Sequence, residues 1–201
     1  MLNLIRLKSG GGSAVRIILV LLLLYTVSGC ASGERGYFID EDVEINLLRR
    51  IAVLPFENNT QTKFVESRMR DVITTEILSR GIFDVVADGD VRRFLKDEVN
   101  GKPEAVDAKI ARRMGSELGV EAFMTGSVDI YNENRNGSYT YPVVAVTLRL
   151  LDVRNNKIIW QASSSETGYG TWSRIFGFAS EDFNQVSFRL AEKVLSSLSE
   201  E

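Results

Sequence analysis

The sequence contains no histidine, one cysteine and three prolines in 201 residues. Without histidine the chain lacks the side chain that most often serves as a general base near neutral pH, and imidazole-based triads and metal sites are excluded with it. A single cysteine can form neither an internal disulfide nor a Cys-x-x-Cys redox pair. The rest of the composition, with 44% hydrophobic and 25% charged residues, is typical of a folded globular protein.

Residues 1–29 are predicted to be a signal peptide. Arg6, Lys8 and Arg16 precede an apolar run from Ile17 to Leu24, and small residues follow, which is the order of a secretory signal. A membrane-spanning helix needs about 20 apolar residues, so this run is too short to stay in the membrane as a span. An ordinary cleaved signal followed by a chance cysteine is one interpretation, and a lipoprotein signal is the other.

The residues around the cysteine favour the lipoprotein. Val27, Ser28, Gly29 and Cys30 resemble the lipobox of bacterial lipoproteins, in which the cysteine is lipidated and becomes the first residue. By the same resemblance Ala31, rather than Asp, implies sorting to the outer membrane. The covalent lipid on Cys30 is then the one non-protein group expected, with no cofactor and no metal.

The charge of the mature chain excludes one class of partner. The signal carries three basic residues and no acid, so its removal leaves 172 residues with a net charge of −6. Binding to nucleic acid depends on a basic surface that contacts phosphates. We therefore expect no nucleic-acid partner, and a lipid tether supplies the affinity for the membrane.

The mature chain divides into a lipidated cysteine with its tether, residues 30–48, and a globular domain, residues 49–201. Residues 31–46 are polar and acidic, whereas from Arg49 apolar patterns of the β and α periods alternate. Strands are predicted at 51–56, 82–86, 120–131, 143–153 and 157–165. Four helices are predicted to begin near Val65, near Asp88 or Asp90, near Val106 and near Phe183. The expected fold class is α/β (α+β): a single-domain mixed β-sheet of about five strands packed with about four helices, with a more open α+β layer as the alternative.

Local signals support individual elements of this prediction. Gly81 is expected to end the first helix, and Asp88 or Asp90 to cap the start of the second. The turn at Arg154–Lys157 contains two asparagines, which tolerate the positive φ of a hairpin turn. The resulting hairpin has one face made by alternate apolar residues, namely Val144, Val146, Leu148 and Leu150.

No set of residues stands out as catalytic machinery. Glu117 with Glu121, or Asp129 with Glu133, could be offered as paired carboxylates for glycoside hydrolysis, but such spacings are common in a chain with 27 acids. Ser163–Ser165 has no histidine to activate it, and the three arginine pairs are typical of a solvated surface. The sequence therefore predicts that the protein is not an enzyme.

One segment concentrates aromatic residues between the last strand and the last helix. Residues 168–178 include Tyr169, Trp172, Arg174, Phe176 and Phe178. Tyr, Trp and Arg are enriched in binding hot spots, and Trp and Tyr at membrane interfaces. We expect these five residues to contact a protein partner or the membrane, while a loop folded back on the core remains the alternative.

Several motifs in order resemble a bacterial envelope family. They comprise residues 51–60 (IAVLPFENNT), 78–86 (LSRGIFDVV), 117–128 (ELGVEAFMTGSV), 146–153 (VTLRLLDV) and 157–160 (KIIW). Together these motifs resemble the CsgG-like group, related to the amino-terminal domain of TolB, whose members include the polysaccharide-export lipoprotein PelC and the synthase activator LpoB. The resemblance covers about residues 49–198.

The resemblance implies a periplasmic, non-enzymatic domain on an outer-membrane lipid anchor, in many members a homo-oligomer that assists export or assembly of an envelope polymer with other envelope proteins. A curli-type pore is not expected, because two membrane-spanning strands of about 9 to 11 residues each do not fit between Ser165 and Phe183. A long stalk, as in LpoB-like activators of peptidoglycan synthases, is also missing from the predicted tether. The expected function is therefore nearer to that of PelC, with synthase activation as the alternative and a small hydrolase as a remote one.

Overall fold

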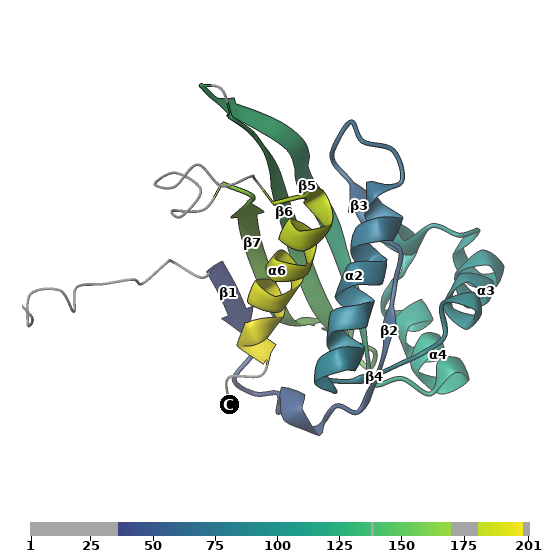
Figure 1. Cartoon of the computed structure of the whole chain (residues 1–201). Coiled ribbons are helices and arrows are strands. Elements are labelled where there is room, and N and C mark those ends of the chain that lie inside the picture. The colour runs from purple at the N-terminus through teal and green to yellow at the C-terminus, as the bar shows by residue number, and fades with distance from the viewer. Residues whose placement is uncertain (1–35, 138, 170–180, 199–201) are drawn as a thin grey trace, which may run out of the picture. The chain divides into compact units, whose positions relative to one another are not determined.

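The computed structural model describes residues 36–137, 139–169 and 181–198, all within one compact unit. In these ranges one seven-stranded sheet is packed with four α-helices (Figure 1). The strands are β1 (Gly36–Ile39), β2 (Arg50–Val53), β3 (Glu57–Asn58), β4 (Asp84–Val85), β5 (Ala122–Asn136), β6 (Tyr139–Asp152) and β7 (Ile158–Thr167). The helices are α2 (Val65–Arg80), α3 (Asp88–Val99), α4 (Ala108–Leu118) and α6 (Phe183–Leu195), with short 3-10 turns η1 (Ile45–Leu47), η2 (Pro103–Ala105) and η3 (Ser196–Leu198).

The sheet is mixed, with the strand order β1-β7-β6-β5-β2-β4 and β3 beside β5. β1, β7, β6 and β5 are antiparallel neighbours, whereas β2, β3 and β4 join by parallel pairing. The parallel part is reached through α2 and through α3 with α4, because parallel strands need a crossover connection. The sheet therefore combines a meander with two crossover units.

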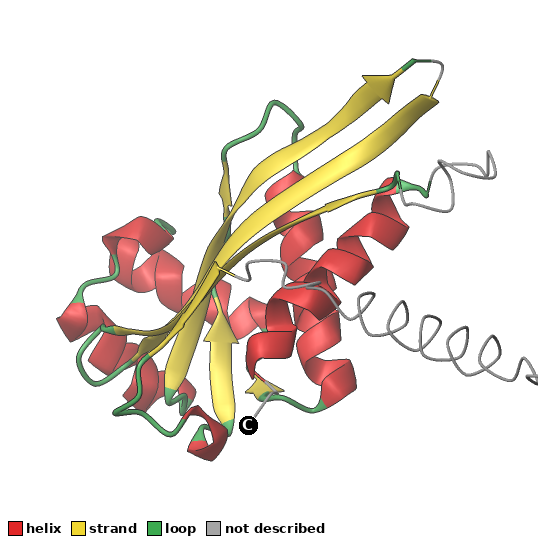
Figure 2. Ribbon diagram, turned by 90° about the vertical axis from the view of Figure 1, so that its left-hand side faces the viewer, coloured by secondary structure: helices red, strands yellow, loops and turns green. Residues whose placement is uncertain are grey.

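Helices cover both faces of the sheet (Figure 2). On one face α2 and α6 bury the larger core, which includes Trp160, Met69 and Leu190. On the other face α3 and α4 bury a smaller core around Phe94, Met114 and Phe123. Gly115 of α4 makes this second contact possible, because a Cβ there would lie 2.8 Å from Cγ2 of Val153.

The fold class is confirmed, and so are the main elements. Val144, Val146, Leu148 and Leu150 all lie in the larger core, as the alternation predicts. The four helices begin near their expected positions, and Gly81 ends α2 with a left-handed φ of 63°. Burial of alternate or helically spaced apolar residues against one sheet is the common physical reason, since it removes the most apolar surface from water.

Two strands were not expected, so the sheet has seven strands rather than about five. β3 has only two residues and pairs with β5. β1 lies inside the predicted tether, pairs with β7 and forms one edge of the sheet. Both segments are too short to show a periodic pattern.

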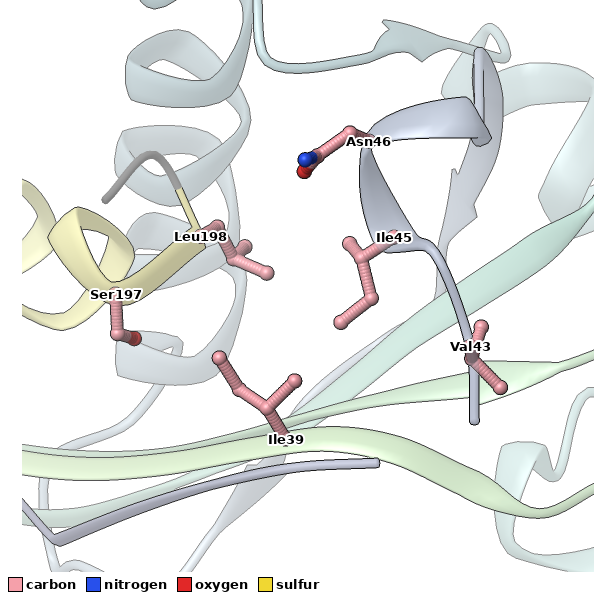
Figure 3. A pocket seen from close by; sticks show the side chains of 6 residues that line it. All are labelled: Ile39, Val43, Ile45, Asn46, Ser197 and Leu198. Carbon is pink, nitrogen blue, oxygen red and sulfur yellow. The ribbon is translucent and has the colours of Figure 1, made fainter. Parts of the chain in front are cut away.

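The tether prediction is wrong for residues 36–47. Besides β1, Ile45 of η1 is buried, and Ile39 and Val43 pack against the larger core. These side chains close on Leu198 and Ser197 around a void of about 10 Å³ (Figure 3), which is room for about one water molecule. The folded unit therefore includes the segment that the sequence assigned to a spacer, and residues 1–35, with the predicted signal peptide, lie outside the described residues.

The predicted caps of α3 are also wrong. The N-cap is Ala87, which makes no side-chain hydrogen bond. The carboxylate of Asp88 instead contacts the guanidinium groups of Arg70 and Arg92. Asp88 is the first residue of α3, one position after the N-cap, and its carboxylate neutralises Arg70 of α2, which is 8% exposed and needs a negative partner.

Candidate interaction surface

The long hairpin of β5 and β6 projects beyond the helices at one end of the molecule (Figure 2). β5 and β6 pair from Ala122↔Asp152, inside the sheet, to Asn136↔Tyr139 near the tip. One irregularity, between Val128 and Ile130, marks the base of the projecting part. The outer side chains are exposed on β5 from Asn132 to Asn136. This projecting end lies beyond the helices that cover the sheet (Figure 2).

The irregularity is a β-bulge that inserts Asp129. Its carboxylate accepts hydrogen bonds from Ser127 Oγ (2.7 Å), Thr147 Oγ1 (2.8 Å) and Asn59 Nδ2 (3.0 Å). Thr147 in turn shares a hydrogen bond of 3.0 Å with Ser163 Oγ of β7. Asp129 therefore links the loop before α2 to three neighbouring strands at the base of the hairpin.

The bulge also changes which side chains face the core. Before it, Val128 packs with α2 and α6, and after it Tyr131 does so instead. Tyr131 stacks on Phe183 of α6 with ring centroids 4.4 Å apart. Ile130 consequently turns to the other face of the sheet, where it is 40% exposed. Bulges are often found where a side chain must be re-aimed beside a functional surface.

A groove of about 540 Å³ lies between the hairpin base and the loop before α2. Its lining contains amides, hydroxyls, two carboxylates and no basic residue: Asn59, Thr60, Gln61, Thr62, Asp129, Ile130, Tyr131, Asn132, Glu133 and Phe183. Glu133 and Ile130 are exposed. The groove is open and its lining is mixed, because Ile130, Tyr131 and Phe183 lie beside the polar groups, and the carboxylate of Asp129 is already occupied by three donors.

Three tyrosines gather on the projecting hairpin. Tyr169, just after β7, stacks on Tyr141 of β6 with centroids 4.9 Å apart and planes inclined by 16°. The ring of Tyr139 lies 6.0 Å from that of Tyr169, and Tyr139 is 45% exposed. Offset aromatic pairs at such distances stabilise one another beyond the area they bury. We call these three residues, Tyr139, Tyr141 and Tyr169, the tyrosine cluster.

The backbone beside the cluster is fixed by close contacts. The N–H of Gly168 donates to the carbonyl of Pro142 at 2.8 Å, and the N–H of Glu181 donates to the carbonyl of Gly168 at 3.3 Å. A Cβ on Gly168 would lie 2.7 Å from Cδ of Pro142 and 2.9 Å from the carbonyl oxygen of Glu181. Only glycine therefore fits at this position without a shift of the neighbouring chain.

Arg189 of α6 ties the same region to the helix. Its guanidinium donates to Glu166 (3.1 Å), to the carbonyl of Thr167 (2.8 Å) and to Glu181. Burial lowers the pKa of Arg189, but the hydrogen bonds to Glu181 and Glu166 raise it by more, so the group keeps its charge. Arg189 thereby joins the end of β7 to the residues that precede α6.

The structure describes one of the site residues expected from the sequence. Tyr169 lies in the tyrosine cluster, half-buried against Tyr141. The rest fall outside the described residues: Cys30 with Val27, Ser28 and Gly29, and Trp172, Arg174, Phe176 and Phe178. Their predicted roles in lipidation and contact stay predictions.

The sequence reasoning missed the partners of Tyr169. Tyr139 and Tyr141 are 28 or more positions away and lie outside the strand predicted at 143–153, so no predicted element placed them on a shared face. Asp129 was interpreted as a solvated charge, whereas it organises the hairpin base. Glu121, which was offered with Glu117 as the other candidate pair, accepts the N–H of Arg49 at 2.5 Å and so fixes the start of β2.

The described ranges lack two features. In them no group of three or more His, Cys, Asp or Glu side chains is placed to hold a metal ion. Among the same residues no helix is long and apolar enough to cross a membrane.

The fold and this surface define a class, an α+β domain on a mixed sheet with a projecting hairpin at one end. The chain belongs to the family of the peptidoglycan-synthase activator LpoB, because the model of that family matches residues 36–165. No protein of curated function matches the chain in sequence.

Solved structures with the same fold include two bacterial proteins. The PelC dodecamer from Paraburkholderia phytofirmans is 20% identical, with a TM-score of 0.56 over 82% of this chain and 95% of that chain. Lipoprotein GNA1162 from Neisseria meningitidis is 19% identical, with a TM-score of 0.54 over 76% of this chain and 99% of that chain. The similarity to PelC confirms that part of the resemblance at the level of the fold, while the CsgG-like and TolB names stay a prediction.

Proposed function

We propose that this protein is an outer-membrane lipoprotein, anchored by a lipid on Cys30, whose domain acts as a non-enzymatic accessory in export or assembly of an envelope polymer. The observation that carries the proposal is the small number of residues between Cys30 and the first strand of the fold. β1 begins at Gly36, six residues after Cys30, and six residues span at most about 21 Å when fully extended. The domain therefore works next to the membrane that holds its lipid.

The similar structures support an assembling role. One is described as a PelC dodecamer and another as a lipoprotein. We infer that this chain also forms a homo-oligomer beneath the outer membrane and meets other envelope proteins there. The absence of histidine from the sequence supports a function in holding and arranging other molecules rather than in transforming them.

The anchor is tested by metabolic labelling with an alkyne analogue of palmitate, followed by separation of inner and outer membranes. We expect label on the wild-type chain in the outer-membrane fraction, no label on Cys30→Ser, and full label on the matched control Ser32→Ala. An unlabelled wild-type chain would remove the anchor from the proposal.

The oligomer is tested on the soluble Cys30→Ser form, produced without its first 29 residues. Light scattering after size exclusion is expected to give a mass several times that of one chain. A strict monomer at the highest concentration reached would count against an assembling role.

A second candidate is activation of a peptidoglycan synthase, which is favoured by the family model over residues 36–165. It predicts that the purified domain raises the rate at which a purified synthase from the same cell polymerises glycan. Both candidates share the short tether, so an activator held within about 21 Å of its lipid anchor must meet its synthase close to that anchor.

A further inference from the structure

β1 forms one of the two outer edges of the sheet (Figure 1). Its four residues pair with β7 on one side, and within the described part of the chain no strand pairs with its other side. The opposite edge, β4, has two residues, one of them the charged Asp84, and lies between the end of α2 and the start of α3. β1 is therefore the longer and less protected of the two edges.

The backbone of β1 presents hydrogen-bonding groups to the open side. The N–H of Asp40 donates to the carbonyl of Ile159 at 2.9 Å, which makes these two residues a hydrogen-bonded pair. Such pairs alternate along an antiparallel ladder, so Phe38, two residues earlier, also directs its N–H and C=O to β7. The N–H and C=O groups of Tyr37 and Ile39 therefore point away from the sheet.

The side chains of β1 are exposed and apolar on both faces of this edge. Tyr37 is 48% exposed and Phe38 is 51% exposed, and neighbours along a strand lie on opposite faces. Proteins protect edge strands with charged residues, proline or bulges, because an unprotected edge accepts another strand. The sequence Gly-Tyr-Phe-Ile contains no charge and no proline, and its register with β7 has no bulge. β1 is thus suited to pair with one more strand.

A second copy of β1, running antiparallel, matches this edge in its backbone. When Tyr37 lies opposite Ile39 of the second copy, and Ile39 opposite Tyr37, each of the two residue pairs exchanges two backbone hydrogen bonds. A register shifted by two residues would place Tyr37 opposite Glu41 or Ile39 opposite Arg35, both outside the strand. The self-pairing with Tyr37 opposite Ile39 is therefore the one that satisfies every outward group of β1 from within β1.

The side chains match in the same register. The two-fold axis of such a pair passes between the two copies of Phe38, which form a non-hydrogen-bonded pair with Cα atoms about 4.5 Å apart. Phe38 lies in one row with Gln161 and Arg149, and Nε of Arg149 donates to Oε1 of Gln161 at 2.9 Å. The two exposed rings would cover each other beside this polar pair, and no charged side chain of β1 is buried by the contact.

On these grounds we propose that β1 pairs antiparallel with β1 of a second copy of this chain about a two-fold axis at Phe38, which joins the two sheets into one. The inference rests on the homo-oligomer of the proposed function and adds the surface through which two copies meet. A contact of this symmetry uses the same patch on both copies and closes after two. A larger assembly therefore needs a second, different surface.

A disulfide reports the register directly. The mature Cys30→Ser chain has no thiol, so Phe38→Cys introduces the only one. Cα atoms about 4.5 Å apart lie within the range that a disulfide bridges. In a glutathione redox buffer we expect most of the Phe38→Cys chain to run as a covalent dimer on a non-reducing gel. Phe64→Cys is the matched control, a phenylalanine outside β1 that is 74% exposed, and should stay mainly monomeric.

A proline tests the backbone ladder. Tyr37→Pro removes an outward N–H and keeps the bonds of Phe38 to β7, and proline is tolerated on an edge strand whose N–H faces solvent. In the Phe38→Cys chain we expect Tyr37→Pro to lower the fraction of covalent dimer several-fold. Tyr37→Thr, which keeps the N–H, should retain the dimer. Circular dichroism of each variant checks that the fold is unchanged.

The other outcomes separate this inference from the proposed function, with light scattering of the Cys30→Ser chain measured in parallel. An oligomer by light scattering without a disulfide at position 38 refutes the pairing of β1 and leaves the homo-oligomer intact. A strict monomer without a disulfide removes both. A disulfide at position 64 as abundant as that at position 38 reports random collision, and one at position 38 that withstands Tyr37→Pro refutes the backbone ladder; either result overturns the inference.

Discussion

At the scale of single residues, Phe64 has a backbone conformation that phenylalanine rarely adopts. Its φ and ψ are 63° and 12°, it precedes α2 without a side-chain cap, and 74% of its surface is exposed. A left-handed conformation costs a non-glycine residue about 1–2 kcal/mol. Little burial offsets this cost, so Phe64 lowers the stability of the domain.

We expect Phe64→Gly to be more stable than Phe64→Ala by about 1 kcal/mol, because alanine keeps the strain and glycine does not. Urea denaturation of both variants beside the wild type measures the difference. A glycine variant less stable than the alanine variant would show that the left-handed backbone carries no strain.

Asp152 at the end of β6 predicts a dependence of stability on pH. It is 3% exposed, and Arg154 donates to it from the backbone (2.8 Å) and from the guanidinium (2.6 Å). Burial raises the pKa of Asp152, but the hydrogen bonds from Arg154 lower it by more, so the pKa lies below its ordinary value. A lowered pKa in the folded state contributes stability above about pH 4 that is lost as the pH falls.

Asp152→Asn is therefore expected to unfold at a lower denaturant concentration than the wild type at pH 7. The gap between the two should shrink as the pH is lowered from about 4 toward 2, where the wild-type carboxylate becomes protonated. Glu133→Gln, an exposed carboxylate on β5, serves as the control and should show no such trend. A gap that stays constant with pH would refute the role of the charge.

At the scale of elements, the hairpin depends on the bulge at its base. Asp129 accepts hydrogen bonds from side chains on β5, β6 and the loop before α2. Removal of such an acceptor leaves several donors without their partner, which costs about 1–3 kcal/mol. The bulge also sets the register that brings Tyr131 onto Phe183.

We predict that Asp129→Ala destabilises the domain by about 2 kcal/mol and speeds hydrogen exchange of the hairpin amides beyond the bulge. Glu133→Ala on the same strand is the control and should change stability by no more than about 0.5 kcal/mol. Unchanged exchange in the tip amides of Asp129→Ala would mean that the ladder of backbone hydrogen bonds alone maintains the hairpin.

The same elements mark what sequence patterns can predict. The alternation in β6 and the helical spacing of apolar residues in α2 and α6 were sufficient, because each reports one face buried along a whole element. β1 gave no such signal, since its four residues are exposed or half-buried and their place is set by pairing with β7. The partner of Asp88 was equally hidden, because Arg70 reaches it from another helix.

The candidate surface was predictable only in part for a related reason. A cluster of aromatic residues after β7 can be recognised along the sequence, and it drew attention to Tyr169. Tyr139 and Tyr141 join Tyr169 through strand register and through the close contact of Gly168 with Pro142. Such contacts between distant segments follow from the tertiary fold and leave no local pattern.

At the scale of the whole molecule, the segment before β2 closes the larger core. Ile45 is 6% exposed, and Ile39 and Val43 line the small void beside Leu198 (Figure 3). The indole N–H of Trp160, which is fully buried, donates to Ser197 Oγ at 3.1 Å in the same neighbourhood. The two ends of the described chain thus stabilise each other.

A chain that begins at Arg49, the domain boundary indicated by the sequence, is expected to be less stable than one that begins at Arg35 by at least about 3 kcal/mol, since loss of one buried isoleucine alone costs about 2–5 kcal/mol. Thermal unfolding of both chains, followed by circular dichroism, tests this. Equal midpoints would show that residues 36–47 are dispensable for the fold.

The pairing of β1 with β7 also has a consequence for the order of folding. β1 is the first strand of the sheet to be synthesised, but its partner β7 is the last. Gly36 therefore cannot pair with Ser163 until almost the entire domain has been synthesised. Closing so long a loop is slow compared with forming local structure. During that delay β1 is not yet docked, so under the proposed lipid anchor the enzymes that attach the lipid and cleave the leader would act before the edge strand pairs.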